Sequence, residues 1–161
     1  MTKLDWSVLD IDYQQEADRI AKRLREITAR ELHKRGLVVA ISGGIDSSSS
    51  VALAVRALGP ERVFALILPE RDSSDDSAAR ANILASHLGI RVETVDIAPA
   101  LAAIGCYKAR DEAVRRALPE YGEGWRFKIV IEGGIDGQIN RFKLVAVSPA
   151  GEQVERPLGL S

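Results

Sequence analysis

The chain has 161 residues, of which 46% are hydrophobic and 28% are charged, and its formal net charge is −1. This length and composition indicate one globular domain with its own core. The near-zero charge argues against nucleic acid or an anionic membrane as a partner. No apolar run approaches the roughly 20 residues that a membrane span needs. The single cysteine, Cys106, excludes an intrachain disulfide and fits a reducing compartment, so we expect a cytoplasmic protein.

The first part of the chain alternates helical and strand patterns. Apolar residues recur every three to five positions over residues 11–35, which predicts an amphipathic helix ending at Gly36. The apolar run LVVAIS (37–42) predicts a strand buried on both faces of a parallel sheet. Further elements are expected as a helix at 48–59, a strand at 62–69, a helix at 74–89 and a strand at 90–97. Strands that alternate with helices predict an α/β fold, a parallel sheet with helices on both faces.

The pattern changes after residue 110. A short helix is expected at 111–118, and RFKIVIE (126–132) and RFKLVAV (141–147) predict the two strands of a β-hairpin over 126–147. SPAGEQVERPL adds a turn and leaves room for one more short strand. We expect one domain over residues 1–161, with the hairpin at its C-terminal end.

The tetrapeptide GGID occurs twice, in different contexts. The first copy (43–46) follows a predicted buried strand and opens a helix, where backbone N–H groups and a partial positive charge favour an anion. The second copy (133–136) lies between two predicted strands, where its glycines supply the positive φ of a hairpin loop. We therefore interpret the first copy as a binding loop and the second as a turn.

The residue types of the first copy suit a phosphate loop. Gly43 and Gly44 let the backbone approach an anion without a Cβ in the way. Serine hydroxyls add donors, so the segment can form an anion-binding nest. An acidic residue in such a loop repels phosphate by itself, so we interpret Asp46 as a ligand of Mg²⁺ that bridges to the phosphates. The loop is neither a Walker A sequence nor G-x-G-x-x-G.

SGGIDSS (42–48) resembles the PP-loop of the N-type ATP pyrophosphatases. Within that superfamily the chain is most similar to ammonia-dependent NAD synthetases. That similarity lies in the isoleucine of the loop, in ALAVRALG and in ALILPERDSSDDSAARANILASHLGI, and it covers roughly residues 14–118. The resemblance implies an adenine nucleotide α-hydrolase-like fold.

The same resemblance implies a reaction. ATP is cleaved between its α- and β-phosphates, the carboxylate of deamido-NAD is adenylated, and ammonia displaces AMP to give NAD. It implies ATP and Mg²⁺ as cofactors, no protein acid–base residue, and a homodimer. The implied ATP-binding residues are Ser42, Gly43, Gly44, Ile45, Asp46, Ser47, Ser48, Leu66, Leu68, Ser73 and Ser74, with Asp46 also holding the metal.

The chain departs from the family after residue 118. A basic helix and a GT-x-x-x-E-type motif, whose glutamate completes the metal site in relatives, are not found. Strand 37–42 is therefore expected to be left at a sheet edge. Three accounts stay open: a truncated chain, a partner chain that completes the site, or a relative that binds nucleotide without turnover. Another PP-loop enzyme with a different acceptor, such as a tRNA base, is a further alternative.

Other reactive residue types are interpreted as structural. His33 and His87 lie late in predicted helices, and with Cys106 they form no metal-ligand spacing. The acidic cluster at 72–76 is expected to charge a helix N-terminus. The basic residues of 108–116 alternate with acidic ones and predict a solvated helix face.

Overall fold

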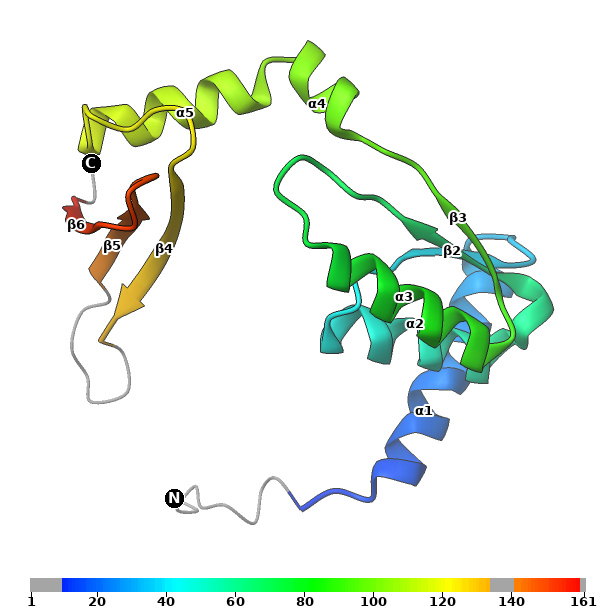
Figure 1. The fold of residues 1–161 in the computed structure, drawn as a ribbon. Helices are drawn as coiled ribbons and strands as arrows, with labels where there is room; N and C mark the ends of the chain where they lie inside the picture. The colour runs from blue at the N-terminus through cyan, green and yellow to red at the C-terminus, as the bar shows by residue number, and fades with distance from the viewer. Residues whose placement is uncertain (1–9, 134–140, 160–161) are drawn as a thin grey trace, which may run out of the picture. The chain divides into compact units, whose positions relative to one another are not determined.

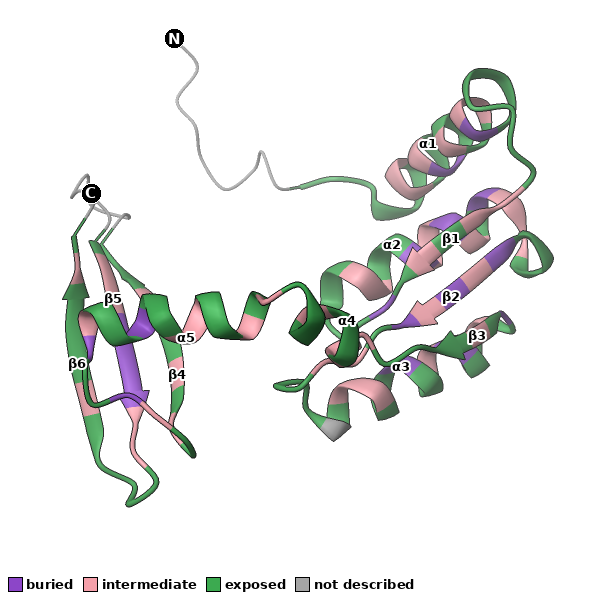
Figure 2. Cartoon of the chain, turned by 90° about the horizontal axis from the view of Figure 1, so that it is seen from above, coloured by how far each residue is buried: buried purple, intermediate pink, exposed green. Residues whose placement is uncertain are grey.

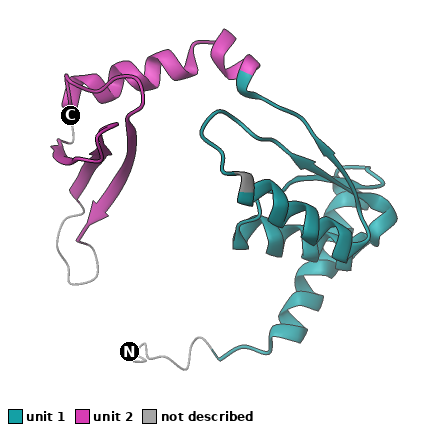
Figure 3. Cartoon of the chain, viewed as in Figure 1, with its two compact units in different colours: residues 1–98 teal, residues 99–161 magenta. Residues whose placement is uncertain are grey.

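A computed structural model describes residues 10–133 and 141–159 (Figure 1). Contacts within the chain divide it into two compact units, Met1–Ala98 and Pro99–Ser161 (Figure 3). Each unit has its own cluster of buried side chains. From the sequence we expected one domain over residues 1–161. In the structure, the buried side chains instead form two separate clusters, one in each unit. None of the described helices is long and apolar enough to cross a membrane.

The first unit alternates helices and parallel strands. Its elements are α1 (Tyr13–Glu26), β1 (Leu37–Ala40), α2 (Ile45–Leu58), β2 (Val63–Ile67), α3 (Asp75–Leu88) and β3 (Arg91–Thr94). The Asp12 carboxylate begins α1 by accepting from the amides of Gln14 and Gln15, both at 3.0 Å. Gly89, in the left-handed conformation at φ 66°, ends α3.

The leading helix ends before the expected Gly36. After Glu26 the chain forms a π-helical turn, Ile27–Glu31, in which the Leu32 amide donates to the Ile27 carbonyl at 2.9 Å. His33 then takes a positive φ of 52°, which turns the backbone away from the helix. The spacing of three to five residues between apolar side chains does not distinguish this turn from an α-helix.

The parallel sheet has the strand order β1-β2-β3, with Val39 in register with Ala65 and Ala65 with Val92. These residues face α2 and α3, and the first unit's core is formed there (Figure 2). The α/β class is thus confirmed, and β1 lies at the edge of the described sheet.

The opposite face of this sheet differs from the expectation. The recorded contacts place α2 and α3 against a single face, while α1 packs on α2. Val38, on the other face, is 65% exposed, so β1 is not buried on both faces as its apolar run predicts. The reason is tertiary, because a strand is buried on both sides only when a second layer packs over it.

The second unit joins helices to an antiparallel sheet. Its elements are α4 (Ala98–Ala103), which begins at the boundary, α5 (Cys106–Ala117), β4 (Arg126–Glu132), β5 (Arg141–Val147) and β6 (Gln153–Leu158). The predicted hairpin is confirmed by the β4–β5 pairing, which runs from Arg126 opposite Val147 to Glu132 opposite Arg141. β6 is the further strand, and it pairs with β5.

Helix α5 covers part of the antiparallel sheet. Val114 and Leu118 pack with Leu144 and Ala146 in one buried cluster. Tyr121 joins them, and its ring meets that of Phe127 edge-on at 5.6 Å. The sequence predicts only residues 111–118 of this helical segment. Its earlier turns, and α4, lie in an alanine-rich stretch whose apolar residues show no clear helical period.

Candidate functional site

The predicted binding loop connects β1 to α2. The Ile41 amide donates to the Leu66 carbonyl at 2.8 Å, which is the last recorded bond between this strand and β2. The chain then leaves the sheet through Ser42 and Gly43, and Gly44 is the N-cap of α2. The loop therefore lies at the carboxyl end of a parallel strand and opens a helix, as predicted. In open α/β sheets this is the place where ligands bind.

The two glycines of the loop have different roles. Gly43 has a positive φ of 73°, and a Cβ on it would lie 2.6 Å from the carbonyl oxygen of Ser77 in α3. Gly44 has an ordinary φ of −84°, and a Cβ there would meet only the Ser42 hydroxyl, at 3.4 Å. The sequence assigned both glycines to anion approach. The structure gives Gly43 a further packing role against α3 and leaves the space around Gly44 open.

The serine side chains bind the loop to itself. The Ser47 hydroxyl accepts from the Ser42 amide at 3.1 Å and donates to the Gly44 carbonyl at 3.1 Å. The Ser48 hydroxyl donates to the same carbonyl at 2.7 Å. These bonds hold the turn in shape without a ligand. That Ser47 and Ser48 hold phosphate therefore stays a prediction. To do so, their hydroxyls would have to donate to the phosphate instead of to the Gly44 carbonyl.

Backbone amides at the start of α2 are available to an anion. The first bond inside this helix runs from the Ser48 amide to the Gly44 carbonyl, at 3.1 Å. Ile45, Asp46 and Ser47 precede it, and their amides have no acceptor among the described residues. Together with the helix dipole, these N–H groups favour bound negative charge.

Asp46 lies in the first turn of α2 and is exposed. No hydrogen bond or ion pair of its carboxylate is recorded within residues 10–133 and 141–159, and no group of three or more metal-ligating side chains exists there. A single carboxylate beside a phosphate loop suits Mg²⁺, which binds through one or two carboxylates plus phosphate oxygens and water. The residues present thus fit the metal that the sequence predicts.

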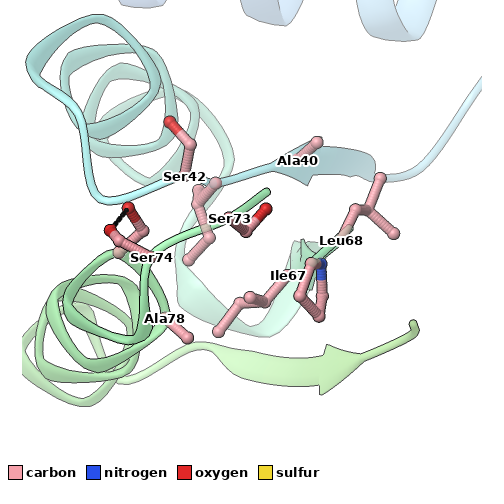
Figure 4. A pocket seen from close by; sticks show the side chains of 10 residues that line it. Ala40, Ser42, Ile67, Leu68, Ser73, Ser74 and Ala78 are labelled. Atoms are coloured by element: carbon pink, nitrogen blue, oxygen red, sulfur yellow. Dashed lines mark hydrogen bonds between the residues drawn. The ribbon is translucent and has the colours of Figure 1, made fainter. Parts of the chain in front are cut away.

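A small pocket opens beside this loop, with a cavity volume of about 190 Å³ (Figure 4). Its lining residues are Ala40, Ile41, Ser42, Ile67, Leu68, Pro69, Ser73, Ser74, Ser77 and Ala78. Complete ligand pockets measure about 300–1,000 Å³, so this cavity suits one part of a nucleotide. It brings together four of the predicted residues, Ser42, Leu68, Ser73 and Ser74. Of the other predicted residues, Ser47 is hydrogen-bonded to Ser42, while Leu66 does not line the cavity.

The two leucines among the predicted ATP-binding residues are not equivalent. The Leu66 carbonyl is already paired with Ile41 in the sheet. Leu68 lies beyond the end of β2, and neither its amide nor its carbonyl has a backbone partner in the described part of the chain. Its neighbours Ile67 and Pro69 are paired instead with Val95 and Ile97, at 2.9 and 3.0 Å. Within the described residues, Leu68 therefore offers an unused backbone donor and acceptor at the pocket.

Serines at and just before the start of α3 form another part of the pocket's lining (Figure 4). The Ser73 hydroxyl accepts from the Glu70 amide at 3.0 Å, which closes the preceding turn. Ser74 is the N-cap of α3, and its hydroxyl lies 2.9 Å from that of Ser77. Sequence reasoning missed Ser77. The signal for it was the spacing of three between Ser74 and Ser77 at a helix start, which places both on one face.

The other interpretations from the sequence can be placed as well. Of the second GGID copy only Gly133 is described, with a positive φ of 96°, and residues 134–140 lie outside the described chain. Cys106 is a free, exposed thiol. Lys108 and Glu112 form an exposed ion pair at 3.9 Å on α5, as a solvated helix face predicts.

The chain is similar in sequence to known proteins over most of its length. The model of the family described as NAD synthase matches residues 16–124. An NH(3)-dependent NAD(+) synthetase of Rhizobium meliloti (strain 1021) is 47% identical over 148 residues, which is 91% of this chain and 44% of that protein. One of Mesorhizobium japonicum is 42% identical over 146 residues, covering 90% and 46% respectively. The chain thus spans less than half the length of these curated relatives.

Solved structures show the same fold. The NH3-dependent NAD synthetase of Campylobacter jejuni, in complex with nitrate ion, matches 68% of this chain and 50% of its own, with a TM-score of 0.55 and 26% identity. An NMN synthetase from Francisella tularensis matches 63% of this chain and 41% of its own, with a TM-score of 0.54 and 27% identity.

Proposed function

Because this chain belongs to the NAD synthase family, we propose that it carries the ATP-binding part of a ligase that makes NAD from deamido-NAD, ATP and ammonia. The observation that supports this most directly is the SGGIDSS loop, which runs from the carboxyl end of β1 into the N-terminus of α2. The deamido-NAD carboxylate would attack the α-phosphate of ATP and release pyrophosphate. Ammonia would then attack the acyl carbon and release AMP.

The loop would serve the first of these steps. Negative charge grows on the leaving pyrophosphate, and donors already aimed at that position stabilise it without reorganisation. The amides of Ile45, Asp46 and Ser47 are such donors, and the hydrogen bonds of Ser47 hold their loop in place. No protein base is needed, because a carboxylate nucleophile is already ionised at neutral pH. Catalysis would be positioning and charge stabilisation.

Asp46 would hold Mg²⁺ at the edge of the loop. The metal, when bound, supplies positive charge that offsets the charge of the phosphates. The protein's contribution is one exposed carboxylate at the helix start, whose own charge would otherwise oppose phosphate binding. The affinity for ATP should therefore depend on Mg²⁺ through this residue.

Leu68 would recognise the adenine ring. A backbone N–H and C=O side by side match the donor and acceptor of an adenine edge, and in the described chain these groups of Leu68 are unused. Its position at the small pocket with Ala40 and Ala78 leaves room for a flat ring. Recognition of deamido-NAD and ammonia rests on family membership alone.

A homodimer in the cytoplasm completes the proposal. The free, exposed thiol of Cys106 is compatible with a reducing compartment. Light scattering at micromolar concentration would test the dimer, and a monomeric mass would contradict it.

The reaction itself is tested by chromatography of the chain incubated with ATP, Mg²⁺, ammonium and deamido-NAD. We expect AMP and NAD to appear together and in equal amounts. A parallel reaction with nicotinate mononucleotide tests the acceptor, since one structural neighbour is an NMN synthetase. If calorimetry shows that ATP binds but neither AMP nor NAD forms, these residues are a nucleotide-binding part and the proposal of activity for this chain is wrong.

A further inference from the structure

The outer strand of the antiparallel sheet has an open edge. The strand order is β4-β5-β6, so among the strands that the structure describes β4 (Arg126–Glu132) is paired on one side only (Figure 1). Its seven residues form an extended run without proline. The other outer strand, β6, contains Pro157, which cannot donate to a further strand. An edge strand of this length presents backbone N–H and C=O groups that can pair with another strand.

Apolar side chains of β4 are exposed next to this edge. Phe127, Ile129 and Ile131 alternate along the strand and point to the face that carries α5, because Phe127 packs against the cluster formed with that helix. Phe127 is half-buried there, whereas Ile129 is 57% and Ile131 58% exposed. The helix thus covers one end of the strand and leaves the other end apolar and open.

Two of the three charges of β4 are arranged symmetrically about Ile129, and the third, Lys128, lies next to it on the N-terminal side. Arg126, three residues before it, is cationic, and Glu132, three residues after it, is anionic. Two antiparallel copies centred on Ile129 would place Arg126 of one copy opposite Glu132 of the other, twice. The same register places Phe127 opposite Ile131 and Ile129 opposite itself. It is the register that pairs all seven residues, and it keeps the apolar residues on one side.

Arg126 and Glu132, at the two ends of β4, are both accessible for ion pairs with a second copy in this register. Arg126 is exposed, and no ion pair of it is recorded among the described residues. Glu132 forms an ion pair with Lys143, and its side chain remains 50% exposed. Lys143 is also paired with Glu155, at 2.9 Å. Glu132 can therefore accept from Arg126 of a second copy while Lys143 keeps a partner.

We propose that β4 is a self-association surface, on which a second copy of this chain pairs through its own β4. The pairing is antiparallel about a two-fold axis at Ile129 and joins two three-stranded sheets into one. A two-fold contact of this kind needs a strand that complements itself, which β4 does. One strand pair is a small interface, so the association should be weak unless other surfaces add to it.

The register can be tested by disulfide trapping in the full chain. In a Cys106→Ser background, Ile129→Cys places two thiols opposite each other, and mild oxidation should give a covalent dimer. The matched variant is Val130→Cys, which lies opposite Lys128 in this register and should cross-link at least about fivefold more slowly. Equal rates, or faster cross-linking of Val130→Cys, would overturn the proposal.

The charge pairing is tested by reversal. Arg126→Glu places like charges opposite each other at two symmetric positions and should weaken self-association, measured by sedimentation, about tenfold. Adding Glu132→Arg restores opposite charges and should recover most of the loss. The control is Arg116→Glu on α5, which makes the same charge change at an exposed arginine and should have no effect.

Circular dichroism of each variant separates misfolding from lost association. If Arg126→Glu is folded and associates as the unchanged chain does, the β4 surface is not used. Since the proposed synthetase activity does not depend on this strand, AMP and NAD formation can fail while the cross-link forms. Conversely, if the chain dimerises but Ile129→Cys does not cross-link, the proposed homodimer stands and β4 is excluded as its interface.

Discussion

At the scale of single residues, Gly43 and Gly44 separate stability from ligand binding. A Cβ on Gly43 would meet the Ser77 carbonyl at 2.6 Å, and the φ of 73° is itself costly for any other residue. We therefore expect Gly43→Ala to lower the free energy of unfolding by about 2 kcal/mol or more. Urea denaturation of the chain without ligand measures this loss.

Gly44 should respond differently. Its φ of −84° is accessible to every residue, and a Cβ there meets only the Ser42 hydroxyl at 3.4 Å. Gly44→Val should lower the stability by only about 1 kcal/mol, which is the typical cost of a disfavoured N-cap residue. ATP affinity should nevertheless fall at least about tenfold, since the added side chain occupies the approach to the α2 amides. Unchanged ATP affinity, measured by calorimetry, would remove the loop from the binding site.

Asp46 gives the third residue-scale prediction. Its carboxylate is exposed and has no recorded partner in the described chain, so Asp46→Asn should leave the fold intact and lower the stability by no more than about 1 kcal/mol, the helix-dipole contribution of a first-turn carboxylate. The dependence of ATP affinity on Mg²⁺ should disappear, because a neutral amide is a poor magnesium ligand. The control is Glu93→Gln, which removes an exposed carboxylate on β3 and should preserve that dependence. A full Mg²⁺ effect in Asp46→Asn would contradict the metal role.

At the scale of elements, Lys143 links β4, β5 and β6. It forms ion pairs with Glu132 and with Glu155. The hydrogen bond from Lys143 holds the pKa of Glu155 below its ordinary value of 4.5, and the same two glutamates raise the pKa of Lys143 above 10.5. The stabilisation from Glu155 is therefore present above about pH 4.5 and is lost as the pH falls through the lowered pKa.

This cross-strand pair predicts a measurable titration. In Lys143→Gln the midpoint of Glu155, followed by NMR of its carboxyl carbon, should rise toward 4.5. Lys143→Arg keeps the positive charge and should keep most of the depression. An unchanged midpoint in Lys143→Gln would show that this pair does not form in solution. Stabilisation from Lys143 itself lies below pH 10.5 and is lost as the pH rises through its raised pKa.

At the scale of the whole molecule, the two units have separate cores. Leu118 is fully buried in the second unit and Val51 in the first. We expect Leu118→Ala to cost about 2–5 kcal/mol and to reduce amide protection in α5 and β4–β6 alone. ATP binding by the first unit should persist. Val51→Ala should lower protection in α2 and β2 instead. Hydrogen exchange measures both, and equal loss throughout the chain in either variant would show that the units unfold together.

The sequence by itself determined the elements and the kind of site. The run LVVAIS followed by SGGIDSS predicts a strand, a turn and a helix start, because apolar runs, glycines and capping residues act on their near neighbours. The same local signals located the hairpin strands at 126–132 and 141–147. These signals did not predict the π-helical turn after Glu26, where the hydrogen-bonding pattern of the helix changes but the type of residue does not.

Only the tertiary structure decided which residues meet at the site. Ser77 lines the pocket because α3 packs against the loop at Gly43. This close approach of α3 to the loop joins two segments that are far apart in the chain. Among the bonds of the described residues, those of Leu68 rather than Leu66 leave the backbone groups unused, because β1 stops pairing with β2 at Ile41. The exposure of Val38 and of Ile129 likewise depends on which layer covers each sheet. Local patterns encode elements, while burial and pairing depend on contacts that one element cannot specify alone.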